Sequence, residues 1–212
     1  MRIFAFVAAV LFAMPASAQL LAPLLTSDGK IACIQGMTGI GRPPGGWEAI
    51  ADKTAFGGWA LAETTGDSTD LHFPMCIAPQ ISVRDVDASI RFKPVAGTRD
   101  RAGGLVLRAQ SAADYYVVVA SARDNAIRIY RMQGGRRSLV ASKDVAVTSG
   151  DWHKLRVLLV GDKFEISLDG KEVLTATDRS LMLPGAVGVW SQSDSVIYFD
   201  SLLLGPPAQA VK

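Results

Sequence analysis

Hydrophobic and polar residues alternate along several segments of this chain, and a period of two is typical of β-strands with one buried face. The alternation is complete in 86–93, where Val86, Ala88, Ile90 and Phe92 are separated by polar residues, and it recurs in 163–169. Six further segments are strand candidates: 104–110, 115–121, 126–132, 152–160, 186–192 and 196–204. Turn residues separate these segments and no amphipathic helix lies among them. The pattern therefore predicts an all-β protein, a two-sheet antiparallel jelly-roll sandwich.

The length of 212 residues fits one such domain, which we expect to span 47–204. Residues 19–46 are interpreted as an N-terminal extension. Its end, the stretch 36–47, reads GMTGIGRPPGGW and is so dense in Gly and Pro that we predict a loop. After the last strand, Gly205-Pro206-Pro207 begins a polar tail, 205–212.

Residues 1–18 have the pattern of a signal peptide. Arg2 precedes the apolar run IFAFVAAVLFAM, and Ala16-Ser17-Ala18 is an A-x-A cleavage signature. The run is too short for a membrane-spanning helix, which needs about 20 apolar residues, and no later segment supplies them. We therefore expect an exported protein, periplasmic or extracellular, with the leader removed and no membrane span.

The charge pattern gives no sign of a nucleic-acid partner. The formal net charge is +2, and removing the leader with its single Arg leaves +1 (2 − 1), with acidic and basic residues interspersed. The pairs Arg99/Arg101 and Arg136/Arg137 lie beside glycine-rich turns, and we interpret them as solvated loop charges.

Two cysteines, Cys33 and Cys76, remain after the leader. An exported chain folds in an oxidising compartment, which favours a disulfide between them. Both lie in apolar stretches, so two separate buried thiols are the alternative.

Several strands also place aromatic, cationic and amide side chains on what we expect to be an outward sheet face. If Leu105 and Leu107 point inward, Arg108 points outward, and Tyr116 is the member of the Tyr pair assigned to the Arg108 face. By the same count Arg128 shares a face with Tyr130. Trp190 likewise shares a face with Gln192. An aromatic platform beside fixed donors and acceptors is what sugar binding requires, although the aromatic residues could instead belong to the core.

The strings AGGLVLRAQSAADYYVVVASARDNAIRIYR, DWHKLRV, GDKFEISLDGKEV and GAVGVWSQSDSVIYFD resemble the concanavalin A-like lectin/glucanase superfamily. They are most similar to exported bacterial proteins with a 3-keto-disaccharide hydrolase domain, over about residues 47–204. The resemblance implies a concanavalin A-like sandwich that binds or hydrolyses glycans, and it matches Arg108 to the family's Arg after the Gly-Gly strand. Because the superfamily contains lectins, binding modules and glycosidases, the fold does not fix the activity.

No catalytic residue is identified from the sequence. Glycosidases commonly need two carboxyls within about 10 Å. Glu165 and Asp169 would lie roughly 13 Å apart along an extended strand. The acidic stretch with Glu63, Asp67 and Asp70 is interpreted as a solvated turn, and a loop-borne general acid or base near His72 is the alternative.

Cofactors are not expected, with one exception: Asp200 lies where related sandwiches hold a structural calcium ion.

These observations give three hypotheses. The first is a glycan-binding or glycan-processing protein whose sugar lies on the exposed sheet face and contacts Arg108, Tyr116, Arg128, Tyr130, Trp190 and Gln192. The second is a hydrolase of oxidised (3-keto) glycosides. The third is a non-enzymatic envelope protein that binds another protein. Carbohydrate is the expected partner, and the sequence does not indicate an oligomeric state.

Overall fold

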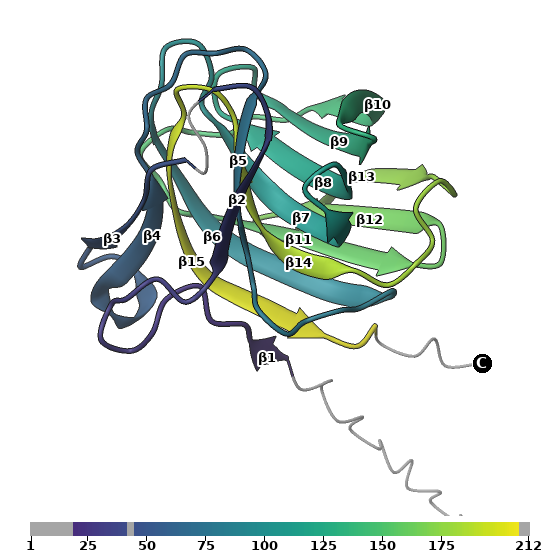
Figure 1. Cartoon of the computed structure of the whole chain (residues 1–212), viewed down its shortest axis with the longest axis horizontal. Helices are drawn as coiled ribbons and strands as arrows, with labels where there is room; N and C mark the ends of the chain where they lie inside the picture. Colours follow the sequence, from purple (N-terminus) through teal and green to yellow (C-terminus); the bar gives the residue numbers. More distant parts are fainter. Residues whose placement is uncertain (1–18, 42–44, 208–212) are drawn as a thin grey trace, which may run out of the picture.

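The computed structural model describes residues 19–41 and 45–207 and consists of two antiparallel sheets packed face to face (Figure 1). Within these residues the only helical element is a short 3-10 turn, η1 (Phe56–Gly58). The predicted leader, 1–18, and the end of the predicted tail, 208–212, lie outside the described residues. The fold is thus the predicted all-β sandwich, and no described helix has the length and apolar character needed to cross a membrane.

The first sheet has eight strands, with β6 and β15 at its centre. Its order is β13 (Lys171–Thr177), β12 (Lys163–Leu168), β11 (His153–Val160), β6 (Val86–Ala96), β15 (Val196–Gly205), β4 (Trp59–Glu63) and β3 (Trp47–Ala51), with β1 (Leu20–Leu21) paired to the end of β15.

The second sheet has seven strands. Its order is β10 (Arg136–Asp144), β9 (Ala126–Gln133), β8 (Asp114–Ser121), β7 (Ala102–Ser111), β14 (Ala186–Ser191), β5 (His72–Ile77) and β2 (Ile34–Gly39).

The main core fills the space between the sheets, and the period-two pattern explains which residues reach it. From the first sheet it receives Val86, Ala88, Ile90, Phe92, Leu155, Val157, Leu159, Phe164, Ile166 and Leu168. From the second it receives Leu105, Leu107, Tyr116, Val118, Ala120, Ile127, Ile129, Val187 and Val189. Removing these side chains from water is the main force that holds the two layers together.

A second apolar cluster lies on the opposite, outer face of the seven-stranded sheet. It contains Phe73, Met75, Ala102, Val106, Tyr115, Val117, Val119, Met132 and Trp190. These residues are almost completely shielded from solvent, although the strands of the described residues form only two layers. The sheet itself must therefore curve around them.

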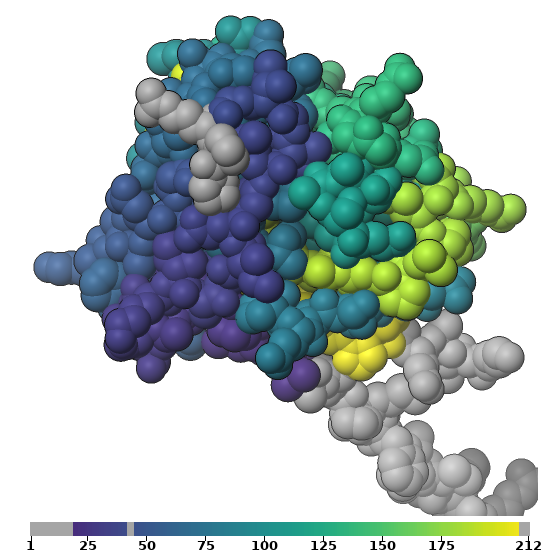
Figure 2. Space-filling model, viewed as in Figure 1, coloured from purple at the N-terminus to yellow at the C-terminus, as the bar shows by residue number. Residues whose placement is uncertain are grey.

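A contact between distant strands confirms this curvature. The guanidinium carbon of Arg137 on β10 lies 4.7 Å from the ring centroid of Phe73 on β5. These strands are five steps apart in the sheet order, which in a flat sheet would be about 24 Å. The far edge also bends inward, since the Thr38 hydroxyl on β2 donates to the Ala112 carbonyl at the β7–β8 turn. Figure 2 shows N-terminal residues (purple) adjoining the teal middle of the chain. We call this side of the sheet the concave face.

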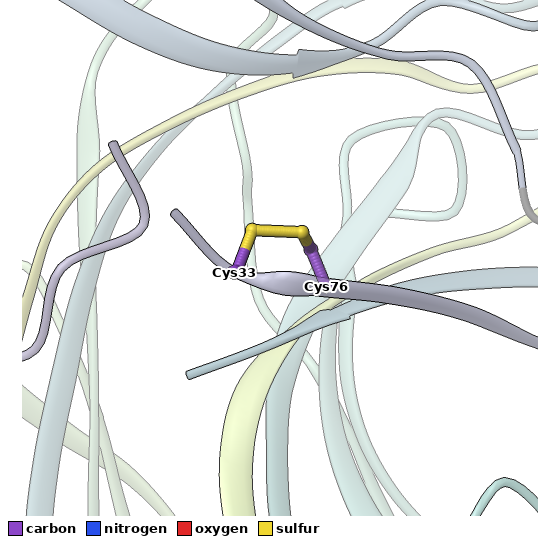
Figure 3. The surroundings of a disulfide bond; sticks show 2 residues. All are labelled: Cys33 and Cys76. Atoms are coloured by element: carbon purple, nitrogen blue, oxygen red, sulfur yellow. A yellow bond between two sulfur atoms is a disulfide. The ribbon is translucent and has the colours of Figure 1, made fainter. Parts of the chain in front are cut away.

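Cys33 and Cys76 form a disulfide, which confirms the favoured pairing (Figure 3). Their Cα atoms are 5.4 Å apart, within the usual range for a disulfide. Cys33 precedes β2 and Cys76 lies on β5, so the bond fastens the edge strand of the concave face to its neighbour.

The N-terminal part of the chain differs from the prediction. The segment 19–46, expected to be an extension, contributes β1 and β2 to the sheets, and β2 occupies Gly36–Gly39 of the predicted loop. The glycines made this strand hard to recognise in the sequence: a Cβ added at Gly36 would lie 3.5 Å from Met75, an ordinary contact, whereas Gly39 ends the strand with a φ of 89°. Residues 42–44 of that loop lie outside the described residues.

Candidate functional site

The structure separates the six predicted ligand-binding residues into two groups. Arg108 and Tyr116 point into the molecule, whereas Arg128, Tyr130, Trp190 and Gln192 lie on the concave face or at its rim.

Arg108 was expected to point outward, and this expectation is wrong. A β-bulge between Leu107 and Ser111 interrupts the alternation, and Arg108 adopts a φ of 50° there. Its side chain is 1% exposed and donates hydrogen bonds to the carbonyls of Arg84 (2.7 Å), Leu181 (2.9 Å) and Gly161 (2.6 Å). Arg108 therefore ties together three connecting segments at one end of the sandwich.

The prediction that Tyr116 shares an outward face is also wrong. Tyr116 lies opposite the inward-pointing Leu107 in the β7–β8 register, so its ring enters the main core and packs edge-on against Phe164. Its hydroxyl donates to Asp178 Oδ1 (2.6 Å) and accepts from the Leu181 amide (3.0 Å). Tyr115 is the tyrosine on the concave face, where its hydroxyl contacts Thr38 (3.0 Å).

Trp190 does lie on the concave face, but at its floor. The indole is fully buried, stacks on Phe73 with 5.3 Å between centroids, and donates from Nε1 to the Tyr115 hydroxyl at 3.2 Å. Both ring faces and the polar group are thus in use within the protein, and Trp190 supports the residues above it instead of offering a free stacking surface.

Polar residues from four regions of the chain meet above this floor, and all of them except the exposed Asp124 are half-buried. Arg137 lies 4.7 Å from the Tyr130 centroid and donates to Gln192 Oε1 at 2.9 Å. Gln192 Nε2 in turn donates to Asp100 Oδ2 at 2.9 Å. Arg128, two residues before Tyr130 on the same face of β9, donates to Asp124 Oδ2 at 2.5 Å. We call these residues the polar ring: Asp100, Asp124, Arg128, Tyr130, Arg137 and Gln192.

Charges within the polar ring influence one another. Burial raises the pKa of Asp100, and the nearby carboxylates of Asp124 and Asp194 add to this effect. Burial opposes the charge of Arg128, but contacts with Asp124 and Tyr130 outweigh it and raise the pKa of Arg128.

Sequence reasoning missed three contributors to this site. Arg137 was interpreted as a solvated loop charge, yet it lies between the rings of Phe73 and Tyr130. Phe73 was not in any predicted strand, and no sequence pattern singled out Asp100 as a site residue. The register of β10 on β9, which pairs Arg137 with Met132, was the missing information.

Asp200 is not suited to hold calcium. One carboxylate oxygen accepts from the Phe56 amide (2.6 Å) and from Arg91 (2.7 Å), and the other accepts from the Ser201 hydroxyl. A guanidinium already occupies the place where a cation would bind. In the described ranges, no group of three or more His, Cys, Asp or Glu side chains is arranged to hold a metal ion.

The expected solvated turn at Glu63 is also incorrect. Glu63 is fully buried at the end of β4, where its Oε1 accepts from the amides of Gly46 (2.9 Å) and Thr65 (3.1 Å). The carboxylate therefore anchors the end of the glycine-rich loop to the sandwich.

One hydroxyl–imidazole–carboxylate chain lies on the other sheet. Thr148 Oγ1 is 3.0 Å from His153 Nε2, and His153 Nδ1 is 2.7 Å from Asp169 Oδ2. Thr148 also donates to Asp151, and Nε2 lies 3.0 Å from the Thr148 carbonyl. Asp169 further accepts from the Lys154 amide (2.7 Å), so the chain fastens two turns together.

Comparisons with known proteins define the fold. No protein-family model matches the chain. No curated protein matches it either. Among solved structures it is similar to the carbohydrate binding module CBM66 from Bacillus subtilis, with 21% identity and a TM-score of 0.57 over 79% of this chain and 95% of that one. A Bacillus subtilis protein of unknown function with a galectin-like fold gives 13% identity and a TM-score of 0.60 over 89% and 96%.

A third similar structure is domain 4 of a GH43 extracellular arabinanase from Geobacillus stearothermophilus, solved in complex with arabinotriose. It gives 14% identity and a TM-score of 0.50 over 80% of this chain and 83% of that one. The chain thus has a concanavalin A-like β-sandwich of the galectin-like jelly-roll kind.

Proposed function

We propose that this protein binds carbohydrate on its concave face, with the polar ring as the binding site. The observation that carries the proposal is the convergence of Tyr130, Arg128, Arg137 and Gln192 at the mouth of a curved sheet. Leu139, 57% exposed and directly opposite Tyr130 on β10, adds apolar surface beside the ring. A sugar needs both an apolar contact for its C–H face and fixed donors and acceptors for its hydroxyls. The similar structures whose names state carbohydrate binding support this function.

Measuring glycan binding by the mature protein and two matched variants tests the proposal. A polysaccharide panel identifies ligands, and calorimetry then compares wild type with Tyr130→Ala and Tyr198→Ala. Tyr198 is the control because it is also half-buried next to a cation, Lys93, but lies on the other sheet. We expect Tyr130→Ala to weaken binding about tenfold or more and Tyr198→Ala to leave it unchanged. No binding to any glycan, or equal effects of both variants, would contradict the proposal.

A second candidate function is hydrolysis of 3-keto-disaccharides, as the family resemblance implies. The specific observation in its favour is that the polar ring contains two interacting carboxyls, Asp100 and Asp124, and that the pKa of Asp100 is raised by burial. Acid–base glycoside cleavage uses two carboxyls, and the one that acts as the general acid has a raised pKa. Asp100→Asn should then abolish turnover of a 3-keto-disaccharide, whereas Asp151→Asn on the other sheet should not. Absence of products with the wild-type protein would remove this candidate.

We also propose that the protein is exported and that cleavage after Ala18 leaves Gln19 as the first residue. The Cys33–Cys76 disulfide supports this proposal, because such bonds persist mainly in oxidising compartments. Fractionation of expressing bacteria followed by N-terminal sequencing tests it. A cytoplasmic protein that retains Met1 would contradict it.

A further inference from the structure

Most arginines in the described ranges pair with a carboxylate, but Arg137 is among those that do not. The seven that form such an ion pair are Arg91, Arg99, Arg108, Arg128, Arg131, Arg156 and Arg179. Arg137 donates instead to the neutral amide oxygen of Gln192. Within ranges 19–41 and 45–207 no carboxylate lies within ion-pair distance of it. The concave face therefore carries a half-buried positive charge that the protein does not neutralise directly.

The two aromatic neighbours fix how this charge is presented. The guanidinium carbon lies 4.7 Å from the centroid of Phe73 and 4.7 Å from that of Tyr130, so two aromatic rings hold the group in place. The N–H groups of the guanidinium lie in its plane and point outward from its edge. Of the five donors that an Arg side chain has, one is accounted for by Gln192. The others remain for a ligand or for water.

A carboxylate is the anion that this geometry fits. Its two oxygens are coplanar and match two parallel N–H groups of a guanidinium. A tetrahedral anion such as sulfate can also accept two N–H groups of a guanidinium, so the experiment below compares the two kinds of anion directly. Nearby Arg128 adds positive charge, although Asp124 neutralises much of it.

We infer that the concave face selects carboxylate-bearing sugars, and that Arg137 is the residue that recognises the carboxylate. This inference rests on the proposed carbohydrate-binding function and specifies its ligand class. A uronate residue would lie with its carboxylate against the edge of Arg137 and its ring toward Tyr130 and Leu139. Gln192 and Asp100 hold Arg137 from the opposite side, so they act as positioning residues.

The test uses acidic polysaccharides and their neutral counterparts. Polygalacturonate, alginate and hyaluronate are each compared by calorimetry with the carboxyl-reduced form, in which CH₂OH replaces the carboxylate. A panel of neutral polysaccharides and a sulfated dextran are included. We expect at least one uronate polymer to bind about tenfold or more tightly than its reduced form, with the difference shrinking as salt is added.

Arg137→Gln should reduce that preference to about threefold or less while leaving the weaker binding of the reduced form unchanged. Arg136→Gln is the matched control, since it removes the same charge from the exposed neighbouring position. Arg137→Lys retains the charge without the planar fork and should recover only part of the preference. A melting curve for each variant shows whether it is folded.

The possible outcomes distinguish the carboxylate inference from the proposed carbohydrate-binding function. Equal binding of acidic and reduced forms, binding of neutral glycans alone, or preference for the sulfated polymer would overturn the carboxylate inference and leave carbohydrate binding intact. An equal loss in the Arg136 and Arg137 variants would also overturn it. If no polysaccharide of any kind binds, the proposed function itself fails.

Discussion

Replacing Arg108 with Met should destabilise the protein strongly without removing a ligand contact. The guanidinium is buried and donates to three carbonyls, those of Arg84, Leu181 and Gly161, and it lies 3.3 Å from Asp85 Oδ1. Met has a similar length and fills much of the same space, but it donates no hydrogen bond. The carbonyls and the carboxylate would lose their partner together.

The size of this destabilisation depends on which of the former acceptors of Arg108 can form hydrogen bonds with water after the substitution. Arg84 and Asp85 are exposed residues and Gly161 is partly exposed, so their oxygens can be hydrated after small movements, whereas Leu181 is buried. Hydrogen bonds to charged groups contribute about 1.5–3 kcal/mol each, and an orphaned buried acceptor costs about 1–3 kcal/mol. The recovered desolvation cost of the charge offsets part of the loss. We expect the free energy of unfolding to fall by about 3–5 kcal/mol, which corresponds to a drop in Tm of roughly 10 °C for a chain of this size.

Urea unfolding and thermal melting of wild type, Arg108→Met and Arg179→Met measure this effect. Arg179 is the control because its side chain is 85% exposed and pairs with Asp162 at the surface, so its loss should change stability by less than about 1 kcal/mol. The reasoning is refuted if Arg108→Met melts within about 2 °C of wild type. It is also refuted if the variant keeps its stability but loses glycan affinity, which would return Arg108 to the ligand-binding role predicted from the sequence.

Three further predictions concern stability. Replacing Cys33 and Cys76 together with Ala should lower the free energy of unfolding by about 4 kcal/mol on the chain-entropy model, and urea unfolding with and without reductant measures it. Burial opposes ionisation of Asp194, but amide donors from Arg99, Asp100 and Thr98 lower its pKa from 3.8 to about 2. Because the folded-state pKa lies below the unfolded one, this stabilisation is present above pH 3.8 and is lost as the pH falls toward 2. After allowance for solvent screening it amounts to about 1–2 kcal/mol, so Asp194→Asn should be less stable than wild type at pH 6 and similar to it at pH 2, by urea midpoint. Gly104→Ala should destabilise by about 1–3 kcal/mol or more, because its Cβ would collide with the Val118 carbonyl, while Gly36→Ala, whose Cβ meets only Met75 at ordinary contact distance, should melt close to wild type.

The alternation of apolar and polar residues predicted well which side chains form the core between the two sheets. Phe164, Ile166 and Leu168, for example, enter the core as their spacing requires, because burial of one sheet face imposes a strict period of two. The same rule placed Arg128 with Tyr130, and Trp190 with Gln192, on the concave side. It failed at Arg108, where a β-bulge turns this side chain and the following Ala109 to the faces opposite to those predicted, and no residue type indicates such a bulge.

Strand pairing across long sequence distances explains the other misses. Positions 115 and 116 are both Tyr, so only the register of β8 against Leu107 decides which of the two side chains faces the core. Arg137 joins the polar ring because the sheet curves, bringing β10 within reach of β5. Curvature is a property of the whole sheet and leaves no local pattern in β10. The burial of Trp190 follows from the same cause.

The cross-link between Cys33 and Cys76 encloses η1, whose Phe56 is 73% exposed and is a natural target for a chymotrypsin-type protease. A cut there would yield two polypeptides that stay covalently joined. Such a nicked molecule would migrate as one band on a denaturing gel until a thiol was added. Since β2 would remain attached to β5, the rim above Trp190 would survive the cleavage.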